Sequence, residues 1–437
     1  MAFDWDGTFG PDIYIKLTNE ERRYLALDPI DDEWDITRYY SKCNITYSRT
    51  TVYWDGDEIK KVIYEENRVW DDYDKPVFRS IEEYDTSLKT ENRKILLPLT
   101  ARGKAKPVTA SNIYAVYPFG CQFYIGIDWR NEEPSAMMSI RNVRNCCSIA
   151  IGEKSRVRAI RDDADFHSFM KYYMDTCPGD YFDRIGHVRT AKHRTVKYKT
   201  GDIFRIEVDR FNYCYGLITG KIKDILKWPE LPEFHSMRTL MTVPIMIRYF
   251  DLVTERSDMT VSELFRYPLS RLSICSDNDI IWGRHEIVGH KELTEDDIEF
   301  NLVCTKISNP NPHFTTHTYD MLVNDGLLSA DDGYELYVEW GTASTILSFD
   351  QISEQLKVFL KDYSDPHGGV MRSIVPDLDG EWYTSKMNLL DPWNQEMKEE
   401  LFRCLGLDPE ADFDDFAAKL GGISKKEALS RLQQKRR

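Results

Sequence analysis

Alternating apolar and polar residues mark the first part of the chain as rich in β-strands. Side chains on a strand point alternately to the two faces of a sheet, and this pattern occupies three segments, residues 44–54, 58–66 and 112–129. Asp55 and Gly56, between the first two segments, predict a tight hairpin turn. Residues 17–27 predict a short helix that begins after Thr18, with Glu21 completing a capping box.

The pattern changes after residue 195 and predicts a small curled sheet or partly closed barrel with one or two helices. Phe204, Ile206 and Val208 alternate with polar residues and form one face of a strand, and residues 209–212 follow as a turn. Three more elements follow, namely a strand over residues 243–253, a helix over residues 260–268 that is capped by Thr260 with Glu263, and a pair of strands within residues 279–293.

The last part of the chain mixes both periodicities. Leu336, Val338 and Trp340 form one face of a strand over residues 335–340. Ser348 is predicted to cap a helix, because apolar residues follow it at helical spacing. Residues 391–434 predict three short helices that are separated by glycine and proline.

These patterns predict an α+β, β-rich fold with three domains. Residues 1–190 form an antiparallel β domain, residues 195–308 a small curled-sheet or barrel-like module, and residues 311–437 an α+β region that ends in short helices. A chain of 437 residues is long enough for several hydrophobic cores.

The charge and the cysteines indicate a reducing, aqueous environment. The net charge of −16 disfavours general binding to nucleic acid, and the basic stretches at residues 93–106 and 184–199 are interpreted as solvated loops or linkers. Nine cysteines without a Cys-x-x-Cys pair are typical of reduced thiols. Without a long apolar run or a leader sequence, we expect a cytoplasmic protein with no membrane partner.

The N-terminus carries a short motif that deserves a chemical test. Phe-Asp-Trp-Asp-Gly-Thr at residues 3–8 resembles the first motif of haloacid dehalogenase-type phosphatases, with Asp4 and Asp6 as the aspartate pair. That motif follows a buried parallel strand, but only three residues precede Asp4. We therefore interpret the segment as a turn, and we predict no catalytic residue.

Three further motifs fall short of metal or nucleotide sites. His285 and His290 are five residues apart, so they cannot share one helix face as zinc-binding histidines do. Residues 216–222 are one residue short of a phosphate-binding loop and lack its Ser or Thr. His313 and His317 lie in a proline-rich turn context. The sequence therefore predicts no metal and no cofactor.

A resemblance to a known family rests on the middle of the chain, residues 195–300. Its residues are a glycine-aspartate strand start, a tyrosine-glycine hairpin return and a late tryptophan before a valine-glycine strand, namely Gly201, Asp202, Phe204, Tyr215, Gly216, Trp282, Val288 and Gly289. This stretch resembles immunity protein 26 of bacterial polymorphic-toxin systems. The resemblance implies a non-enzymatic immunity protein that binds and neutralises a toxin.

An inhibitor of this kind needs a binding surface, and aromatic residues and arginine are the best anchors of such surfaces. The predicted partner-binding residues are Tyr213, Tyr215, Trp228, Phe234, Tyr249, Trp282 and Arg284. An acidic protein gains association rate toward a basic toxin. The alternative is a multidomain effector or nucleic-acid-associated defence protein, in which the immunity-like module is a regulatory or binding part.

Overall fold

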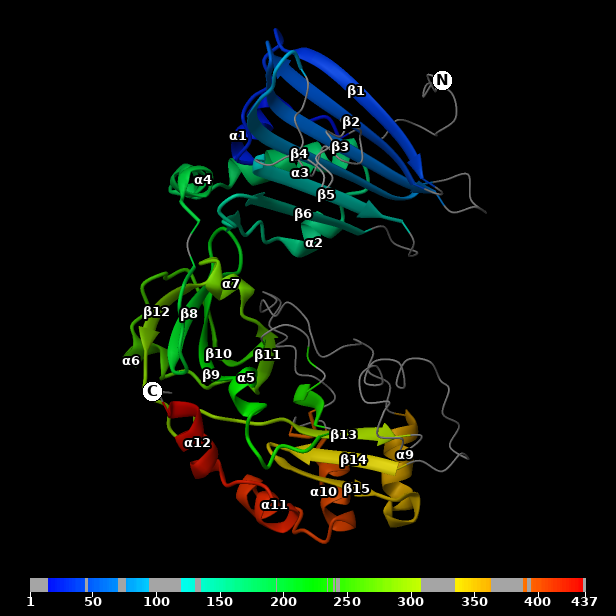
Figure 1. Cartoon of the computed structure of the whole chain (residues 1–437), viewed down its shortest axis with the longest axis vertical. Coiled ribbons are helices and arrows are strands. Elements are labelled where there is room, and N and C mark those ends of the chain that lie inside the picture. Colours follow the sequence, from blue (N-terminus) through cyan, green and yellow to red (C-terminus); the bar gives the residue numbers. More distant parts are fainter. Residues whose placement is uncertain are drawn as a thin grey trace. The chain divides into compact units, whose positions relative to one another are not determined.

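The computed structural model describes residues 15–43, 46–69, 76–93, 119–129, 135–193, 195–233, 235–238, 240, 244–307, 335–362, 388–390 and 394–434. They form two compact units (Figure 1). The first unit takes the described part of Met1–Thr195 together with Glu207–Asn212 and Trp282–Arg284, and the second takes the rest. Both units combine antiparallel sheets with helices, so the predicted α+β, β-rich class is confirmed.

The first unit contains a seven-stranded antiparallel sheet in which each strand pairs with its neighbours along the chain. Its strands are β1 (Asp35–Cys43), β2 (Thr46–Asp55), β3 (Glu58–Val69), β4 (Pro76–Lys89), β5 (Phe119–Asp128), β6 (Ser135–Asn142) and β7 (Ser148–Ile149). The hairpin predicted between β2 and β3 is confirmed, because Asp55 pairs with Glu58 and Gly56 has a φ of 58°.

Helices cover one face of this sheet (Figure 1). They are α1 (Asn19–Tyr24), α2 (Lys154–Arg158), α3 (Asp163–Asp175) and α4 (Tyr181–Thr190). Phe123 of β5 meets Phe166 of α3 with their ring centroids 6.1 Å apart, and the capping box of Thr18 and Glu21 is confirmed. The interpretation of residues 184–199 as a loop is wrong for their first part, because Ile185 and Val188 bury one side of α4 in this core.

The second unit begins with a five-stranded antiparallel sheet in the order β11-β10-β9-β8-β12. Its strands are β8 (Asp202–Glu207), β9 (Tyr213–Lys221), β10 (Pro244–Thr254), β11 (Ser273–Ser276) and β12 (Glu286–His290). β11 and β12 are its two edges, so among the described residues the sheet is open and not a closed barrel. The turn before β9 is confirmed: Asp209 Oδ1 accepts hydrogen bonds from the amides of Phe211, at 2.6 Å, and Asn212, at 2.7 Å.

Short helices connect these strands, namely α5 (Ile222–Ile225), the 3₁₀ turn η2 (Ser236–Arg238), α6 (Val261–Leu264) and α7 (Asn278–Ile281). The capping box of Thr260 and Glu263 on α6 is confirmed. The pair of strands predicted within residues 279–293 is half wrong, because its first member is α7. The amides of Ile280 and Ile281 donate to the carbonyl of Asp277, which closes a helical turn despite the β-branched side chains.

A three-stranded sheet and the last helices complete the second unit. They are β13 (Leu302–Ile307), β14 (Glu335–Trp340), β15 (Ala343–Leu347), the 3₁₀ turn η3 (Phe349–Gln351), α9 (Glu354–Asp362), α10 (Gln395–Cys404), α11 (Phe413–Leu420) and α12 (Lys425–Gln433). The three tail helices and the buried face of β14 are confirmed. Ser348 caps η3, so the predicted start of the following helix is wrong: α9 begins at Glu354.

One hydrophobic core runs through the second unit. It joins side chains of β8–β10 to those of β14 and of α10–α12. Trp340 packs edge-on against Phe413, with 5.4 Å between ring centroids, and the Arg431 guanidinium of α12 pairs with Glu230 at 2.6 Å. The predicted boundary near residue 310 lies outside the described residues, so the division into three domains stays a prediction. None of the described helices is long and apolar enough to cross a membrane.

Candidate functional site

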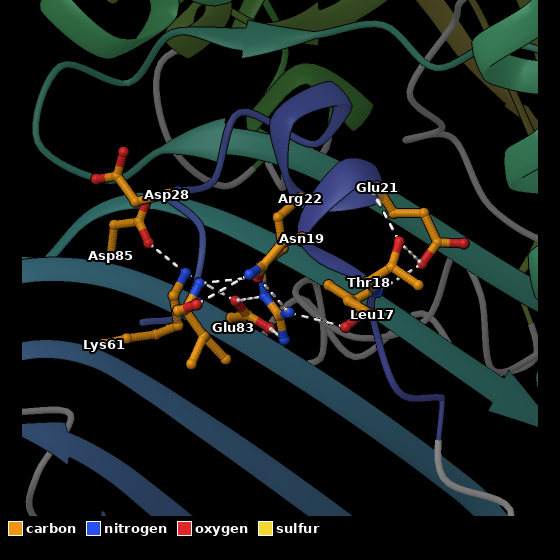
Figure 2. A network of polar contacts seen from close by, with 10 residues as sticks. Leu17, Thr18, Asn19, Glu21, Arg22, Asp28, Lys61, Glu83 and Asp85 are labelled. Carbon is orange, nitrogen blue, oxygen red and sulfur yellow. Dashed lines mark hydrogen bonds and ion pairs between the residues drawn. The ribbon is translucent and has the colours of Figure 1, made fainter. Parts of the chain in front are cut away.

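A buried ion-pair network ties α1 to strands β3 and β4 of the first unit (Figure 2). The side chain of Lys61 is 0% exposed, and its ammonium lies 2.7 Å from Glu83 and 2.5 Å from Asp85. Arg22 donates to both oxygens of Glu83, through Nε at 2.7 Å and through Nη2 at 3.1 Å. Two cations therefore face two carboxylates within one water-excluded cluster.

Backbone and amide groups satisfy the remaining polar atoms of the cluster. Arg22 Nη1 donates to the Leu17 carbonyl at 2.8 Å and to Asn19 Oδ1 at 3.2 Å. The amide of Asp28 donates to Asp85 Oδ2 at 2.7 Å. A buried ion pair is retained without a large penalty only when such additional hydrogen bonds are made, so this network has the character of a structural clamp.

The two carboxylates of the network differ in their pKa. Burial raises the pKa of Asp85 to about 6, against the opposing effect of the Lys61 ammonium. Burial acts on Glu83 in the same direction, but the charges of Lys61 and Arg22 outweigh it and hold the pKa of Glu83 below its ordinary value. Near neutral pH both groups are therefore ionised, and acidification protonates Asp85 first.

A second cluster contains the residue types of a hydrolytic triad, but its imidazole is already occupied. His235 is buried, and its Nε2 lies 2.6 Å from the Gly341 carbonyl while its Nδ1 lies 3.1 Å from the amide of Met237. The Ser236 hydroxyl donates to Glu339. With Nε2 donating and Nδ1 accepting, the ring has no nitrogen left to take a proton from a serine.

Metal binding finds no support in the part of the chain that the structure describes, where no group of three or more His, Cys, Asp and Glu residues could hold an ion. His290 lies on strand β12, within the residues 279–293 for which strands were predicted. Asp4, Asp6, His313 and His317 lie outside the described residues. Eight cysteines in the described segments are not in disulfide bonds.

The start of the five-stranded sheet explains two of the residues that carry the family resemblance. Gly201 has a φ of 89°, and a Cβ at this position would lie 2.3 Å from the Lys291 carbonyl oxygen. The Asp202 carboxylate accepts from the amide of Lys199 at 2.8 Å and lies 2.9 Å from His290 Nδ1. Gly201 and Asp202 therefore fix the entry of the chain into β8, next to the end of β12.

Close contacts with neighbouring side chains explain the other two glycines that carry the resemblance. A Cβ at Gly216 would lie 2.4 Å from the ring of Phe204, and one at Gly289 would lie 2.7 Å from Val261. The Tyr215 hydroxyl donates to the Arg256 carbonyl at 2.8 Å. The two glycines are thus required for packing, because the space that a Cβ would occupy is filled by Phe204 or Val261.

The segment that contains these glycines matches a known protein family. Residues 199–311 match the family model of immunity protein 26. The match confirms the resemblance that the sequence motifs indicated, and it covers about a quarter of the chain. The comparison with curated proteins and the comparison with solved structures gave no match.

The predicted partner-binding residues of the immunity protein 26 segment lie in different surroundings. Tyr213, Tyr215 and Trp228 are buried in the shared core of the second unit, and the Arg431 guanidinium lies 5.7 Å from the Trp228 ring. Tyr249 is buried, and its ring packs edge-on against that of Phe204. A buried side chain can shape a binding surface without touching the partner.

Two further predicted residues lie outside that core. Trp282 and Arg284 belong to the first unit and are partly exposed. The Arg284 guanidinium lies 5.0 Å from the Trp282 ring, and Arg284 Nε donates to the Cys146 carbonyl at 2.7 Å. Phe234 lies outside the described residues. The partner-binding role of the whole set stays a prediction.

An ordered charged surface lies over Tyr213 and Tyr215, and sequence reasoning missed it. We call it the arginine rim, and it consists of Arg205, Arg256, Asp258, Glu263 and Glu286. Arg205 pairs with Glu286 at 2.7 Å and lies 5.0 Å from the Tyr213 ring, and Arg256 pairs with Asp258 and Glu263 at 3.1 and 2.9 Å. The outward position of Arg205 in the alternation of β8 was the available signal.

Proposed function

We propose that this protein is a non-enzymatic bacterial immunity protein that binds and neutralises a cognate protein toxin. The match of residues 199–311 to immunity protein 26 carries this proposal. The satisfied His235 ring supports it, because the one serine-histidine-glutamate cluster described above has no free base. The protein would act in the cytoplasm, where its thiols stay reduced.

The arginine rim is the surface that we expect to contact the toxin. Its arginines are already held by carboxylates, so binding would cost little further side-chain entropy. Asp258 and Glu286 are 79% and 55% exposed, which leaves them able to meet a basic partner. The overall charge of −16 would speed the encounter with such a toxin.

Growth rescue tests the function. Each polymorphic-toxin domain encoded beside the gene is produced in a host cell, with and without this protein, and the complex is then purified by affinity capture. We expect one toxin to arrest growth, the full chain to restore it, and the two proteins to co-purify. If the full chain restores growth against none of these toxins and binds none of them, the proposed function is wrong.

Charge reversal then tests the rim separately from the function. Asp258→Lys is expected to weaken toxin capture by about tenfold or more, as the loss of a charge pair at an interface does. Glu410→Lys is the control, because Glu410 is exposed on the same unit and is not part of the arginine rim. Equal capture by the two variants would show that the toxin binds elsewhere on the protein.

A further inference from the structure

The seven-stranded sheet of the first unit ends in two edge strands of very different length. At one end, β7 has two residues and is too short to bind a further strand. At the other end, β1 has nine residues, and among the described residues it pairs only with β2 (Figure 1). Since an edge strand presents unpaired amide and carbonyl groups, β1 is the edge at which a further strand can be added.

Strand β1 lacks most of the features that protect such an edge. Its register with β2 is continuous along the whole strand, without a bulge, and its sequence, Asp-Ile-Thr-Arg-Tyr-Tyr-Ser-Lys-Cys, contains no proline. Proteins commonly block an exposed edge with a bulge, a proline, a very short strand or a charged residue. Of these devices β1 has only charged residues, and one of them, Arg38, lies near the middle of the strand.

One face of β1 carries exposed side chains of the kinds that bind proteins. Ile36, Arg38 and Tyr40 alternate along this face, and all three are exposed, Ile36 at 47% and Tyr40 at 46%. They lie on the side of the sheet that carries the helices, because Ile36 pairs with Tyr53, and Tyr53 pairs with Lys61 of the buried network. We call these three residues the β1 face. Arginine and tyrosine beside an apolar side chain are typical anchors of protein interfaces.

Arg38 has no acidic neighbour on the β1 face. Thr51 lies opposite it on β2, and the diagonal neighbours on β2 are Arg49 and Tyr53. The guanidinium of Arg49 donates to both carboxylate oxygens of Glu65, through Nη2 at 2.6 Å and through Nε. Among the described residues, no carboxylate forms an ion pair with Arg38. The β1 face is thus a local positive site on a protein of net charge −16, and it complements an acidic partner.

A second copy of the chain fits this edge poorly. Two β1 strands that paired antiparallel about a twofold axis at Arg38 would place the two guanidinium groups directly opposite each other. In the register that overlaps all nine residues, centred on Tyr39, the two Arg38 residues would be diagonal neighbours on the same face. Like charges at such positions oppose strand pairing, so Arg38 disfavours pairing with a second copy and favours an acidic strand.

We propose that β1 binds an extended acidic segment of a partner protein, which adds to the sheet as a further antiparallel strand. The main-chain hydrogen bonds of the added strand would supply affinity, and its alternate side chains would supply selectivity. An aspartate or glutamate opposite Arg38 would form the ion pair, and apolar residues two positions before and after it would lie opposite Tyr40 and Ile36. This site belongs to the first unit, so it does not depend on the function proposed for the immunity protein 26 segment.

Two matched peptides test this proposal on the full-length chain. The first is Thr-Val-Thr-Glu-Thr-Val-Thr, with a fluorophore at its amino end and an amide at its carboxyl end, and the second has lysine in place of glutamate. Fluorescence anisotropy measures the affinity of each peptide at constant ionic strength, and hydrogen exchange follows the amides of residues 35–43. In the free chain about half of these amides should exchange fast, because alternate residues of an edge strand point their amides away from the sheet.

The acidic peptide should bind and protect β1. We expect it to bind saturably and to slow the fast amides of residues 35–43, and we expect the lysine peptide to bind at least about tenfold more weakly, because its charge repels Arg38. Arg38→Glu should reverse this preference, and Arg38→Gln should remove it. Arg158→Glu is the matched control, since Arg158 is an exposed arginine of helix α2 in the same unit. This control should keep the preference for the acidic peptide.

The proposal is overturned if the acidic peptide leaves the amides of residues 35–43 unchanged, or if both peptides bind the wild type equally. An unchanged preference in Arg38→Glu would overturn it as well. Protection of nearly all of these amides in the free chain would show that the edge is already occupied. The occupant would be another segment of the chain if this protection is independent of protein concentration, and a second copy if it rises with concentration; either occupant would replace the acidic partner.

Discussion

Replacing Lys61 by methionine should destabilise the first unit by about 3–5 kcal/mol at pH 7, the usual cost of removing one partner from a buried ion pair. Methionine fills most of the space of the lysine stem, so the loss is chiefly electrostatic. Glu83 keeps its two bonds to Arg22. Asp85 loses the Lys61 ammonium, the one cation that contacts it among the described residues, and keeps the Asp28 amide at 2.7 Å. Most of the cost therefore falls on this carboxylate.

The cost of Lys61→Met should shrink as the pH falls. Burial already raises the pKa of Asp85 to about 6, whereas an unfolded aspartate titrates near ~3.9. Between these values the folded state binds the extra proton, so the unfolding free energy rises on acidification through this window. Loss of the ammonium moves the upper limit of the window to higher pH. For each unit by which the pKa of Asp85 rises in the variant, acidification restores about 1.4 kcal/mol more of the lost unfolding free energy.

Hydrogen exchange of the full-length chain measures this change without assuming that the two units unfold together. Peptides from β3 and β4 report the opening free energy at pH 7 and at pH 5. Lys60→Met is the matched control, since Lys60 is 27% exposed and pairs with Glu58 at 3.2 Å; its cost should stay below about 1 kcal/mol. Adding Asp85→Asn to Lys61→Met should restore much of the loss. Equal costs for the two lysine variants, or a cost for Lys61→Met that is the same at both pH values, would refute the reasoning.

Two more predictions concern packing. Gly216→Ala should lower the unfolding free energy of the second unit by about 1–3 kcal/mol, because the new methyl overlaps the Phe204 ring; Gly186→Ala, in open space on a helix, should instead be neutral or stabilising in the same thermal melts. Residues 199–311 produced alone should show no cooperative melt, because their core is completed by the C-terminal helices. A sharp melt of that fragment would contradict the shared core.

Elements that depend on nearby residues could be predicted from the sequence. The capping boxes at Thr18 and Thr260 join atoms three residues apart, and both are present. The hairpin at Asp55 follows from a local turn preference in the same way. Helix α3 went unpredicted although Phe166, Phe169, Met170 and Tyr173 have helical spacing, so here the signal was available.

Contacts between distant residues could not be predicted. In the sequence, Lys61 is one more polar residue of an alternating strand. The register of β3 and β4 and the docking of α1 bring its ammonium next to the carboxylates. Trp228 is one of the predicted partner-binding residues, and direct contact with a partner requires a surface position. It is buried because α12, about 200 residues away, covers it with Arg431. Burial at such positions is set by tertiary packing, which no local window contains.

Under the function proposed above, the glycine positions of the five-stranded sheet also bear on how toxin choice can diversify. Gly201, Gly216 and Gly289 are constrained by their neighbours inside the protein, whereas the charged side chains of the arginine rim stand at the surface. Selection for a different toxin could therefore replace residues of the arginine rim while the five-stranded sheet keeps its fold. Two proteins that share this sheet could then protect against unrelated toxins, and the identity of the target would have to be sought in the variable surface.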